Sequence, residues 1–178
     1  MKKILIITTS LRPNSNSDLL GESFYKGALE AGNDVEIISL KGKTINFCRG
    51  CFACQKSKEC AIKDDSNFIV DKICNSDVIV WVTPVYYYEM SGQMKTLIDR
   101  ANPLYARDYK FKEVYLLCTA WEDEEYTPKH VIGGVQGWVD CFEGVKFIDT
   151  LFVGGVNSPG EIKNNEGLKK AYELGKRV

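Results

Sequence analysis

The sequence of 178 residues lacks the features that mark several large classes of protein. No apolar run approaches the roughly 18 residues that a membrane-spanning helix needs, so we predict no membrane segment. The apolar stretch at residues 4–7 is also shorter than the core of a secretion signal, which needs about seven or more residues. The formal net charge is only −1 and the basic residues are scattered, so nothing indicates nucleic acid or an anionic membrane as a partner. We therefore expect a cytoplasmic globular protein.

Several catalytic and nucleotide-binding signatures are missing as well. The single histidine, His130, has no acidic or serine partner that the sequence suggests, so we assign it no general-base role. Neither G-x-G-x-x-G, typical of dinucleotide sites, nor G-x-x-x-x-G-K-[ST], typical of nucleoside triphosphate sites, occurs. The first apolar run is followed by no acidic pair, which weakens a response-regulator receiver. It is also followed by no cysteine with an arginine six residues later, which weakens a small tyrosine phosphatase.

Strand-like apolar runs alternate with helix-like segments along the whole chain. We predict strands at residues 4–8, 35–40, 78–82, 114–118 and 145–153, and helices at about 17–31, 64–75, 91–102, 128–142 and 162–176. This alternation indicates an α/β protein with a doubly wound parallel sheet and helices on both faces. The first, third and fourth runs are apolar throughout, as in buried strands, whereas the second and fifth carry polar residues and suit the edges. The predicted order is therefore 2-1-3-4-5, the flavodoxin-like order, in one five-stranded domain over residues 1–178.

The loop after the first predicted strand is rich in hydrogen-bond donors. It offers the hydroxyls of Ser10, Ser15 and Ser17, the amide of Asn16 and the cation of Arg12, and it leads directly into a helix. In the flavodoxin-like order, ligands bind at the carboxyl ends of strands one and three. Free backbone N–H groups and the positive end of a helix favour an anion there, so we predict a phosphate monoester. The alternative is a polar capping loop that binds nothing.

The loop after the third predicted strand reads TPVYYYEMSG and carries three consecutive tyrosines beside Pro84. Such a flat, partly apolar surface suits an aromatic ring system, although tyrosine clusters also serve packing or subunit contacts. Because this loop would lie next to the predicted phosphate site, it predicts a planar aromatic ligand with a phosphate on a short tether. Flavin mononucleotide (FMN) is such a molecule.

Four of the seven cysteines lie close together in a loop at residues 47–63: Cys48, Cys51, Cys54 and Cys60. Without a secretion signal, cysteines are expected as thiols or metal ligands rather than as disulfides. The spacing C-x2-C-x2-C-x5-C leaves open a [4Fe–4S] cluster, a zinc ion, a thiol–disulfide switch between Cys51 and Cys54, and a structural loop without metal. We expect the remaining cysteines to be core thiols: Cys74, Cys118 and Cys141.

Three segments carry a resemblance to a known family: TSLRPNSNS, TPVYYYEMSGQMKTLIDR and CRGCFACQKSKECAIKDD. They are similar to those of the NAD(P)H-dependent FMN reductase and iron–sulfur flavoprotein family, and the similarity extends over nearly the whole chain. The resemblance implies that the FMN phosphate is bound at Ser10, Arg12, Ser15, Asn16 and Ser17. It implies that the ring lies beside Pro84, Val85, Tyr86, Tyr87 and Tyr88, with further contacts at Thr119, Ala120 and Trp121. Thr9 and Trp121 depart from the family, which often has glycine and small residues there, so Trp121 either stacks on the ring or narrows access to it.

The resemblance also implies an oxidoreductase in which bound FMN carries the chemistry and no protein side chain acts as acid, base or nucleophile. Electrons would pass from NAD(P)H through FMN to a quinone, a free flavin or another small acceptor. An alternative is an iron–sulfur flavoprotein that carries electrons from ferredoxin through a [4Fe–4S] cluster at the four cysteines to FMN. A third possibility is a metal-stabilised binding module without flavin. The resemblance further implies a homodimer or a larger homo-oligomer.

Overall fold

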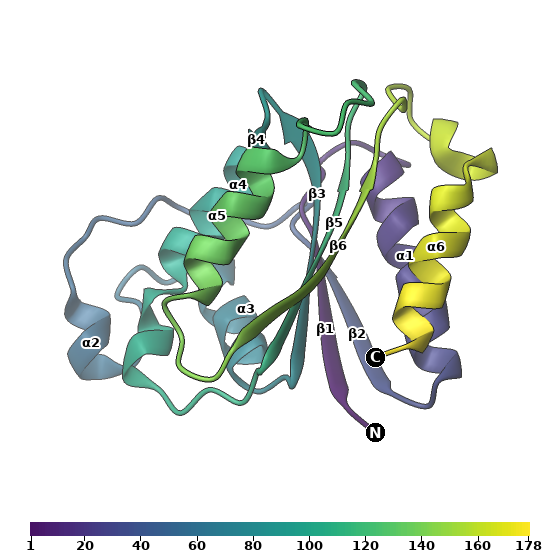
Figure 1. The fold of residues 1–178 in the computed structure, drawn as a ribbon. Helices are drawn as coiled ribbons and strands as arrows, with labels where there is room; N and C mark the ends of the chain where they lie inside the picture. The colour runs from purple at the N-terminus through teal and green to yellow at the C-terminus, as the bar shows by residue number, and fades with distance from the viewer.

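The computed structural model describes residues 1–178, and at its centre is a sheet whose main strands all run parallel (Figure 1). From one edge to the other the strands are β2 (Asp34–Ser39), β1 (Lys3–Thr8), β3 (Val78–Tyr86), β5 (Glu113–Thr119) and β6 (Lys146–Val153). This confirms the order predicted for the parallel strands. The predicted count of five is wrong by one, because β4 (Glu89–Met90) pairs antiparallel with the end of β3. A strand of two residues is too short to leave a periodic pattern in the sequence.

Helices cover both faces of the sheet (Figure 1). One face carries α1 (Asn16–Glu30) and α6 (Glu166–Lys176), and the other carries α3 (Asp65–Cys74), α4 (Gly92–Arg100) and α5 (Lys129–Val139). Three short elements were not expected from the sequence: α2 (Ala53–Ser57) and two 3-10 turns at Asn102–Ala106 and Glu161–Asn164. The α2 helix lies within the cysteine-rich loop, far to the side of the sheet in Figure 1.

One expected core thiol is not in the core. Cys74 and Cys118 are buried, but Cys141 is exposed. The helix predicted to reach residue 142 ends at Val139, which places Cys141 in the turn that follows α5. The prediction for Cys141 is therefore wrong, because a helical apolar pattern in the sequence does not show where the helix stops.

The sequence of β1 is apolar throughout because both of its faces are covered. Ile4 and Ile6 pack with α1 and α6 in one core cluster, whereas Leu5 and Ile7 pack in the cluster on the opposite face. All four side chains are at most 1% exposed. This continuous burial fixes the end of β1, and therefore the start of the loop that follows it.

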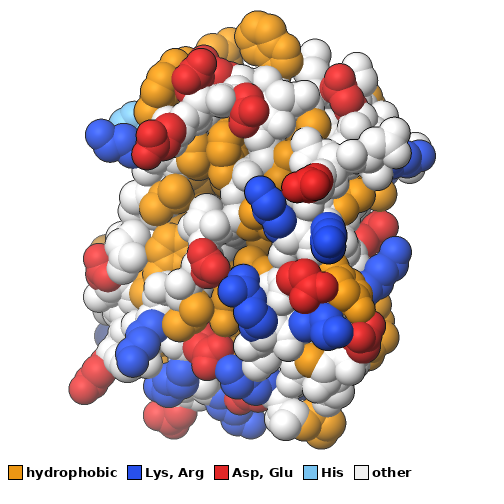
Figure 2. All heavy atoms as spheres, turned by 45° about the vertical axis from the view of Figure 1, so that its right-hand side comes forward, with side chains coloured by type: hydrophobic (Ala, Val, Ile, Leu, Met, Phe, Trp, Pro, Cys, Tyr) orange, Lys and Arg blue, Asp and Glu red, His pale blue; other side chains and the backbone are white.

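None of the helices is both long enough and apolar enough to cross a lipid bilayer. On the face shown in Figure 2, acidic and basic side chains are interspersed. Charges of mixed sign produce no strong field of one sign. The charge preference of a binding site on this protein is therefore decided by the groups that line the site.

Close packing of α1 against α6 depends on glycine, and this predicts a large effect of a small substitution. A Cβ atom at Gly27 would collide with the carbonyl oxygen of Tyr172 on α6. We expect Gly27→Ala to lower the free energy of unfolding by about 1–3 kcal/mol, since the two backbones must move apart. Gly133 in α5 is the matched control, because nothing lies within 4 Å of its added Cβ atom. In urea denaturation, Gly133→Ala should raise the free energy of unfolding by up to about 1 kcal/mol. If Gly27→Ala and Gly133→Ala lowered this free energy by the same amount, the explanation would be contradicted.

Candidate functional site

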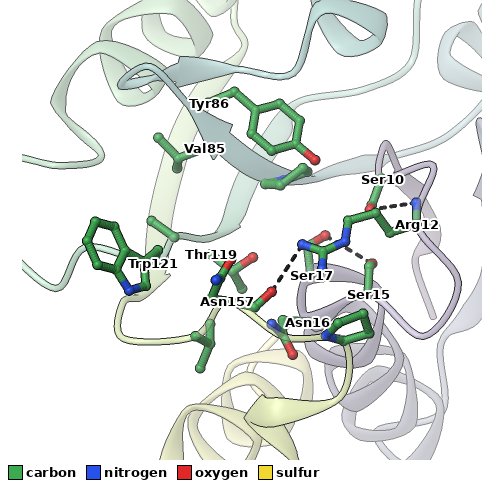
Figure 3. A pocket seen from close by; sticks show the side chains of 14 residues that line it. Ser10, Arg12, Ser15, Asn16, Ser17, Val85, Tyr86, Thr119, Trp121 and Asn157 are labelled. Atoms are coloured by element: carbon green, nitrogen blue, oxygen red, sulfur yellow. Dashed lines mark hydrogen bonds between the residues drawn. The ribbon is translucent and has the colours of Figure 1, made fainter.

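A hollow of about 160 Å³ lies at the carboxyl ends of β1, β3 and β5 (Figure 3). It is lined by Ser10, Arg12, Ser15, Asn16, Ser17, Pro84, Val85, Tyr86, Thr119, Ala120, Trp121, Val156, Asn157 and Pro159. The structure therefore brings together every residue expected to bind a cofactor except Tyr87 and Tyr88. In such sheets ligands generally bind outside the carboxyl ends of the strands, at the point where the strand order reverses, and the hollow lies there.

One wall of the hollow is the loop after β1 together with the first turn of α1, here called the anion loop (residues 9–17). Ser15 caps α1, and its Oγ accepts a hydrogen bond of 3.1 Å from the backbone of Asp18. The Oγ atoms of Ser15 and Ser17 are 3.3 Å apart, and Ser10 Oγ accepts the backbone N–H of Arg12 at 3.3 Å. The first backbone N–H groups of a helix have no carbonyl partner within the helix. Hydroxyls and free N–H groups on one side of a hollow form a site that fits an anion such as phosphate.

Two polar side chains of the anion loop also hold the loop after β6. Asn16 donates from Nδ2 to the carbonyl of Ser158 at 3.0 Å and accepts the backbone N–H of Ile162 at 3.2 Å. Arg12 donates from Nη1 to the carbonyl of Asn157 at 3.0 Å. Figure 3 shows the Arg12 guanidinium between Ser17 and Asn157, so its positive charge lies at the hollow. The side chain of Asn16 is mainly occupied by structural contacts, which leaves the serines and Arg12 as the freer donors.

The opposite wall is largely apolar and is formed by two strand ends, here called the ring wall (residues 84–86 and 119–121). Val85 and Tyr86 come from the end of β3, and Thr119 and Trp121 come from the end of β5 (Figure 3). Thr119 is buried, whereas Trp121 is 77% exposed at the mouth of the hollow. Apolar walls with a few hydrogen-bonding groups are typical of sites for planar organic ligands.

Tyr87 and Tyr88 lie in the turn between β3 and β4 and do not line the hollow. Both have left-handed backbone angles, with φ of 50° and 66°, and Tyr87 is 98% exposed. Such angles cost about 1–3 kcal/mol each for residues other than glycine and are found preferentially at functional sites. The turn is fixed in part by Tyr88, whose hydroxyl donates to Glu122 at 3.4 Å. Contact of these two rings with a ligand stays a prediction.

The loop after β6 supplies three lining residues that were not expected from the sequence: Val156, Asn157 and Pro159. It is joined to the end of β5 by backbone hydrogen bonds from Gly155 to Trp121, at 3.1 Å, and from Val156 to Ala120, at 3.0 Å. The available signal was the run of glycine, asparagine, serine and proline at residues 154–160, where a strand ends on the ligand side of the sheet. It was missed because β6 is an edge strand, and the topological rule points to the ends of β1 and β3.

Thr9 joins the anion loop to the start of α4. Its hydroxyl accepts a hydrogen bond of 3.0 Å from Ser91 Oγ, and its carbonyl accepts one of 2.6 Å from Gln93. The Thr9 side chain is fully buried. A glycine, which is frequent in related loops, could not make the Ser91 contact, so threonine fixes the two ligand-side loops relative to each other.

The four clustered cysteines line a second hollow, of about 350 Å³, within the cysteine loop (residues 47–63). Cys54 is buried and Cys60 is partly buried, while Cys48 and Cys51 are exposed. No three of these thiols converge in the arrangement of a preformed metal cage. Cys54 Sγ accepts a hydrogen bond of 3.0 Å from Asn102 Nδ2. Four sulfur atoms around one hollow are a donor set that suits an iron–sulfur cluster or zinc.

A buried ion pair lies beside the cysteine loop. Arg100 at the end of α4 donates to both carboxylate oxygens of Asp64, at 2.7 and 3.0 Å. The two side chains are 0% and 4% exposed, respectively. Burial alone would raise the pKa of Asp64, but hydrogen bonds from Arg100, Asn46 and Ser66 outweigh burial and hold this pKa well below its usual range. The carboxylate is therefore charged at neutral pH, as its role as N-cap of α3 also favours.

Comparison with known protein sequences gives a match to a family and a similar relative. A sequence model of the family described as NADPH-dependent FMN reductase matches residues 2–125. An iron-sulfur flavoprotein of Methanocaldococcus jannaschii is 30% identical over 190 residues, which cover 99% of this chain and 95% of that protein.

Solved structures resemble the fold of this chain. An NAD(P)H:quinone oxidoreductase from Methanothermobacter marburgensis has a TM-score of 0.74 at 20% identity, with 98% of this chain and 94% of that chain covered. An FMN-dependent NADH-azoreductase from Bacillus anthracis, solved in complex with FMN, has a TM-score of 0.69 at 15% identity, with 99% of each chain covered. At such identities these likenesses are evidence of the flavodoxin-like fold alone, and they agree with the fold predicted from the strand pattern.

Proposed function

Because this chain belongs to the NADPH-dependent FMN reductase family, we propose that it is an FMN-dependent oxidoreductase. It passes electrons from NAD(P)H to a quinone, a flavin or another small acceptor. The observation that carries this proposal is the pairing of a donor-rich loop with an apolar wall in one hollow. The anion loop suits a phosphate and the ring wall suits a planar ring, and FMN combines the two.

Different residues of the hollow bind different parts of FMN. The hydroxyls of Ser10, Ser15 and Ser17 donate to the phosphate, and Arg12 adds a positive charge beside it. The hollow of about 160 Å³ is smaller than the roughly 300–1,000 Å³ of pockets that enclose a whole ligand. The phosphate and tail therefore account for much of the hollow, and a second substrate has access at its open mouth beside Trp121.

When bound, FMN supplies the redox chemistry by accepting hydride and releasing electrons. The protein binds and orients it through the two walls. No histidine, lysine, aspartate or glutamate lines the hollow, so no side chain is assigned as a catalytic acid or base.

Anaerobic stopped-flow mixing of the FMN-loaded protein with NADPH, and separately with NADH, tests this function. We expect at least one nicotinamide to bleach the visible flavin absorbance rapidly, and a quinone added afterwards to restore it. Nicotinamide oxidation no faster than that caused by the same concentration of free FMN would contradict the proposal. The comparison of the two nicotinamides also decides between NADPH and NADH.

A second function is favoured by the cysteine loop: an electron carrier that takes electrons from ferredoxin through a [4Fe–4S] cluster to FMN. Three observations support this function. The four thiols line one hollow, Asn102 donates a hydrogen bond to Cys54, and this chain is similar to an iron-sulfur flavoprotein. Anaerobically purified protein should then contain about four iron atoms per chain, held by four cysteines. Cys54→Ser should lose this iron, whereas Cys141→Ser, outside the loop, should keep it. Iron-free protein that turns over NAD(P)H would exclude the carrier.

We also propose that residues 1–178 form one flavin-binding domain, that the protein is cytoplasmic, and that it is a homodimer or a larger homo-oligomer. Exposed rings available for a second copy include Tyr87, at 98% exposure, and Phe47, at 80% exposure. Light scattering after gel filtration should give at least twice the chain mass. A monomer at high concentration would contradict the assembly.

A further inference from the structure

We infer that Arg100 is a positioning residue for the cysteine loop. Its buried guanidinium holds both ends of the loop against α4 and leaves one donor for the side of the hollow where Cys60 lies. This inference rests on the proposed use of the cysteine loop in the second function. It concerns the protein before any metal is bound, so it can be tested separately.

The hydrogen bonds of Arg100 close the cysteine loop at its base. Nη1 donates to the carbonyl of Asn46 at 2.7 Å, just before the loop begins. Nη2 donates to the carbonyl of Ile62 at 2.9 Å, where the loop ends. Asp64, which follows directly, neutralises the guanidinium and also accepts the backbone N–H of Asn46 at 2.9 Å. One side chain, 0% exposed, therefore holds two segments that are separated by the whole cysteine motif.

Two side chains outside the loop support its interior: Asn102 donates to Cys54 Sγ and Asn67 Nδ2 donates to the carbonyl of Cys60, each at 3.0 Å. Neither carries a charge or joins the two ends of the loop. Phe52 and Lys58, on either side of α2, both have left-handed backbone angles, with φ of 55° and 62°. The α2 helix has five residues and no side-chain cap at its start. Isolated helices of this length are not stable by themselves in water. The loop therefore needs an external anchor, and Arg100 with Asp64 is the buried one.

One donor of Arg100 remains unused. Nε is buried and has no hydrogen-bond partner in the protein, although the other two guanidinium nitrogens are fully engaged. Arg100 and Cys60 line the thiol hollow together and also share a neighbouring hollow of about 320 Å³. Buried donors are normally paired, so an unpaired one indicates a missing acceptor. Because Cys60 lines both hollows together with Arg100, we assign its sulfur, or a group bound to it, as the acceptor for this donor.

The same helix also reaches the flavin site. The start of α4 holds Thr9 of the anion loop through Ser91 and Gln93, and its last residue is Arg100. A rigid helix of nine residues thus joins the supports of both hollows. Loss of the Arg100 contacts should free the cysteine loop without loosening the anion loop, because the two sets of hydrogen bonds lie at opposite ends.

Hydrogen exchange of the metal-free, FMN-loaded protein tests the anchor. We expect amides of residues 47–63 to exchange at least about 10-fold faster in Arg100→Met, a loss of about 1.4 kcal/mol of local protection. Amides of β1 and β3 exchange through global unfolding, so a change there reports overall stability, which urea denaturation measures separately. The FMN content should not change. Arg100→Lys should recover only part of the protection, because an ammonium group cannot span both carbonyls. Arg107→Met is the matched control, because Arg107 pairs with Asp71 and is 21% exposed, whereas Arg100 is fully buried. It should leave the exchange rates of residues 47–63 unchanged.

Anaerobic reconstitution with iron and sulfide separates this inference from the carrier function. If the wild type takes up iron, Arg100→Met should release it to a chelator at least about 10-fold faster, since the loop opens more often. If the wild type takes up none while Arg100→Met still speeds loop exchange, the carrier fails and the anchor stands. Equal exchange of the loop in wild type and variant overturns the anchor, and so does equal iron retention when the wild type has taken up iron. If Arg100→Met does not fold, the comparison of Arg100→Lys with the wild type decides in the same way.

Discussion

Replacing Ser17 with aspartate is expected to weaken FMN binding by about 100-fold or more, the largest effect on binding that the hollow offers. Ser17 lies in the first turn of α1 and lines the hollow, so the new carboxylate would lie next to the phosphate. Two like charges about 4 Å apart repel by about 4 kcal/mol at the effective dielectric constant of about 20 that applies to charge pairs in proteins. Each tenfold change in affinity corresponds to about 1.4 kcal/mol. Fluorescence titration of the apoprotein with FMN measures the change.

Two controls make the Ser17 result specific for the phosphate. Ser17→Ala should cost only about 10-fold, because it removes one hydrogen bond to a charged group. Riboflavin, which has no phosphate, should bind Ser17→Asp and Ser17→Ala about equally. Ser17 is 1% exposed, so urea denaturation of each apoprotein has to show that the variant is folded before the affinities are compared. If Ser17→Asp weakened riboflavin and FMN to the same extent, the phosphate would not lie at the anion loop.

Replacing Asp64 with asparagine is expected to produce the largest loss of stability, about 3–5 kcal/mol at neutral pH. The change leaves the buried charge of Arg100 without its partner, while both side chains lie almost completely out of solvent. Asparagine caps a helix about as well as aspartate, so the loss reports the charge rather than the cap of α3. Urea denaturation gives the free energy of unfolding. Asp71→Asn is the matched control, because Asp71 is 58% exposed in its pair with Arg107, and exposed pairs contribute about 1 kcal/mol at most.

The pH dependence of the Asp64 effect has a defined direction. In the folded protein the pKa of Asp64 is held below its usual range, whereas in the unfolded chain it is about 3.9. The unfolded state therefore takes up the proton first as the pH falls. The stabilisation by Asp64 is complete above about pH 5 and declines at lower pH, so wild type and Asp64→Asn should converge in acid. A constant difference between pH 7 and pH 3, or a loss no larger than that of Asp71→Asn, would contradict the role given to this pair.

The sequence was most informative where burial is continuous. The apolar residues 4–7 and 78–82 predicted central strands, and the mixed runs at residues 35–40 and 145–153 predicted edges, as the structure has them. Strand order in turn placed the loops after β1 and β3 on the same side of the sheet, and both line the hollow. These inferences succeeded because a strand covered on two faces has few alternatives to apolar residues.

Features that depend on contacts between distant segments could not be predicted in this way. Asn157 reaches the hollow only because the loop after β6 is hydrogen-bonded to the end of β5. Arg100 stands in the sequence next to Asp99 and near Lys95, which gives no sign of burial. It is nevertheless 0% exposed, since its guanidinium donates to the carbonyls of Asn46 and Ile62 from both ends of the cysteine loop. The short β4 strand is also set by tertiary packing, since it forms by pairing with the end of β3.

The central claim is that one hollow holds the phosphate of FMN on the anion loop and its ring on the opposite wall. A crystal structure of the protein soaked with FMN tests it most directly. We expect phosphate oxygens about 2.7–3.2 Å from the hydroxyls of Ser10, Ser15 and Ser17, with the ring against residues 84–86 and 119–121. FMN bound with its phosphate elsewhere, or a hollow that stays filled by protein side chains at saturating FMN, would contradict the account.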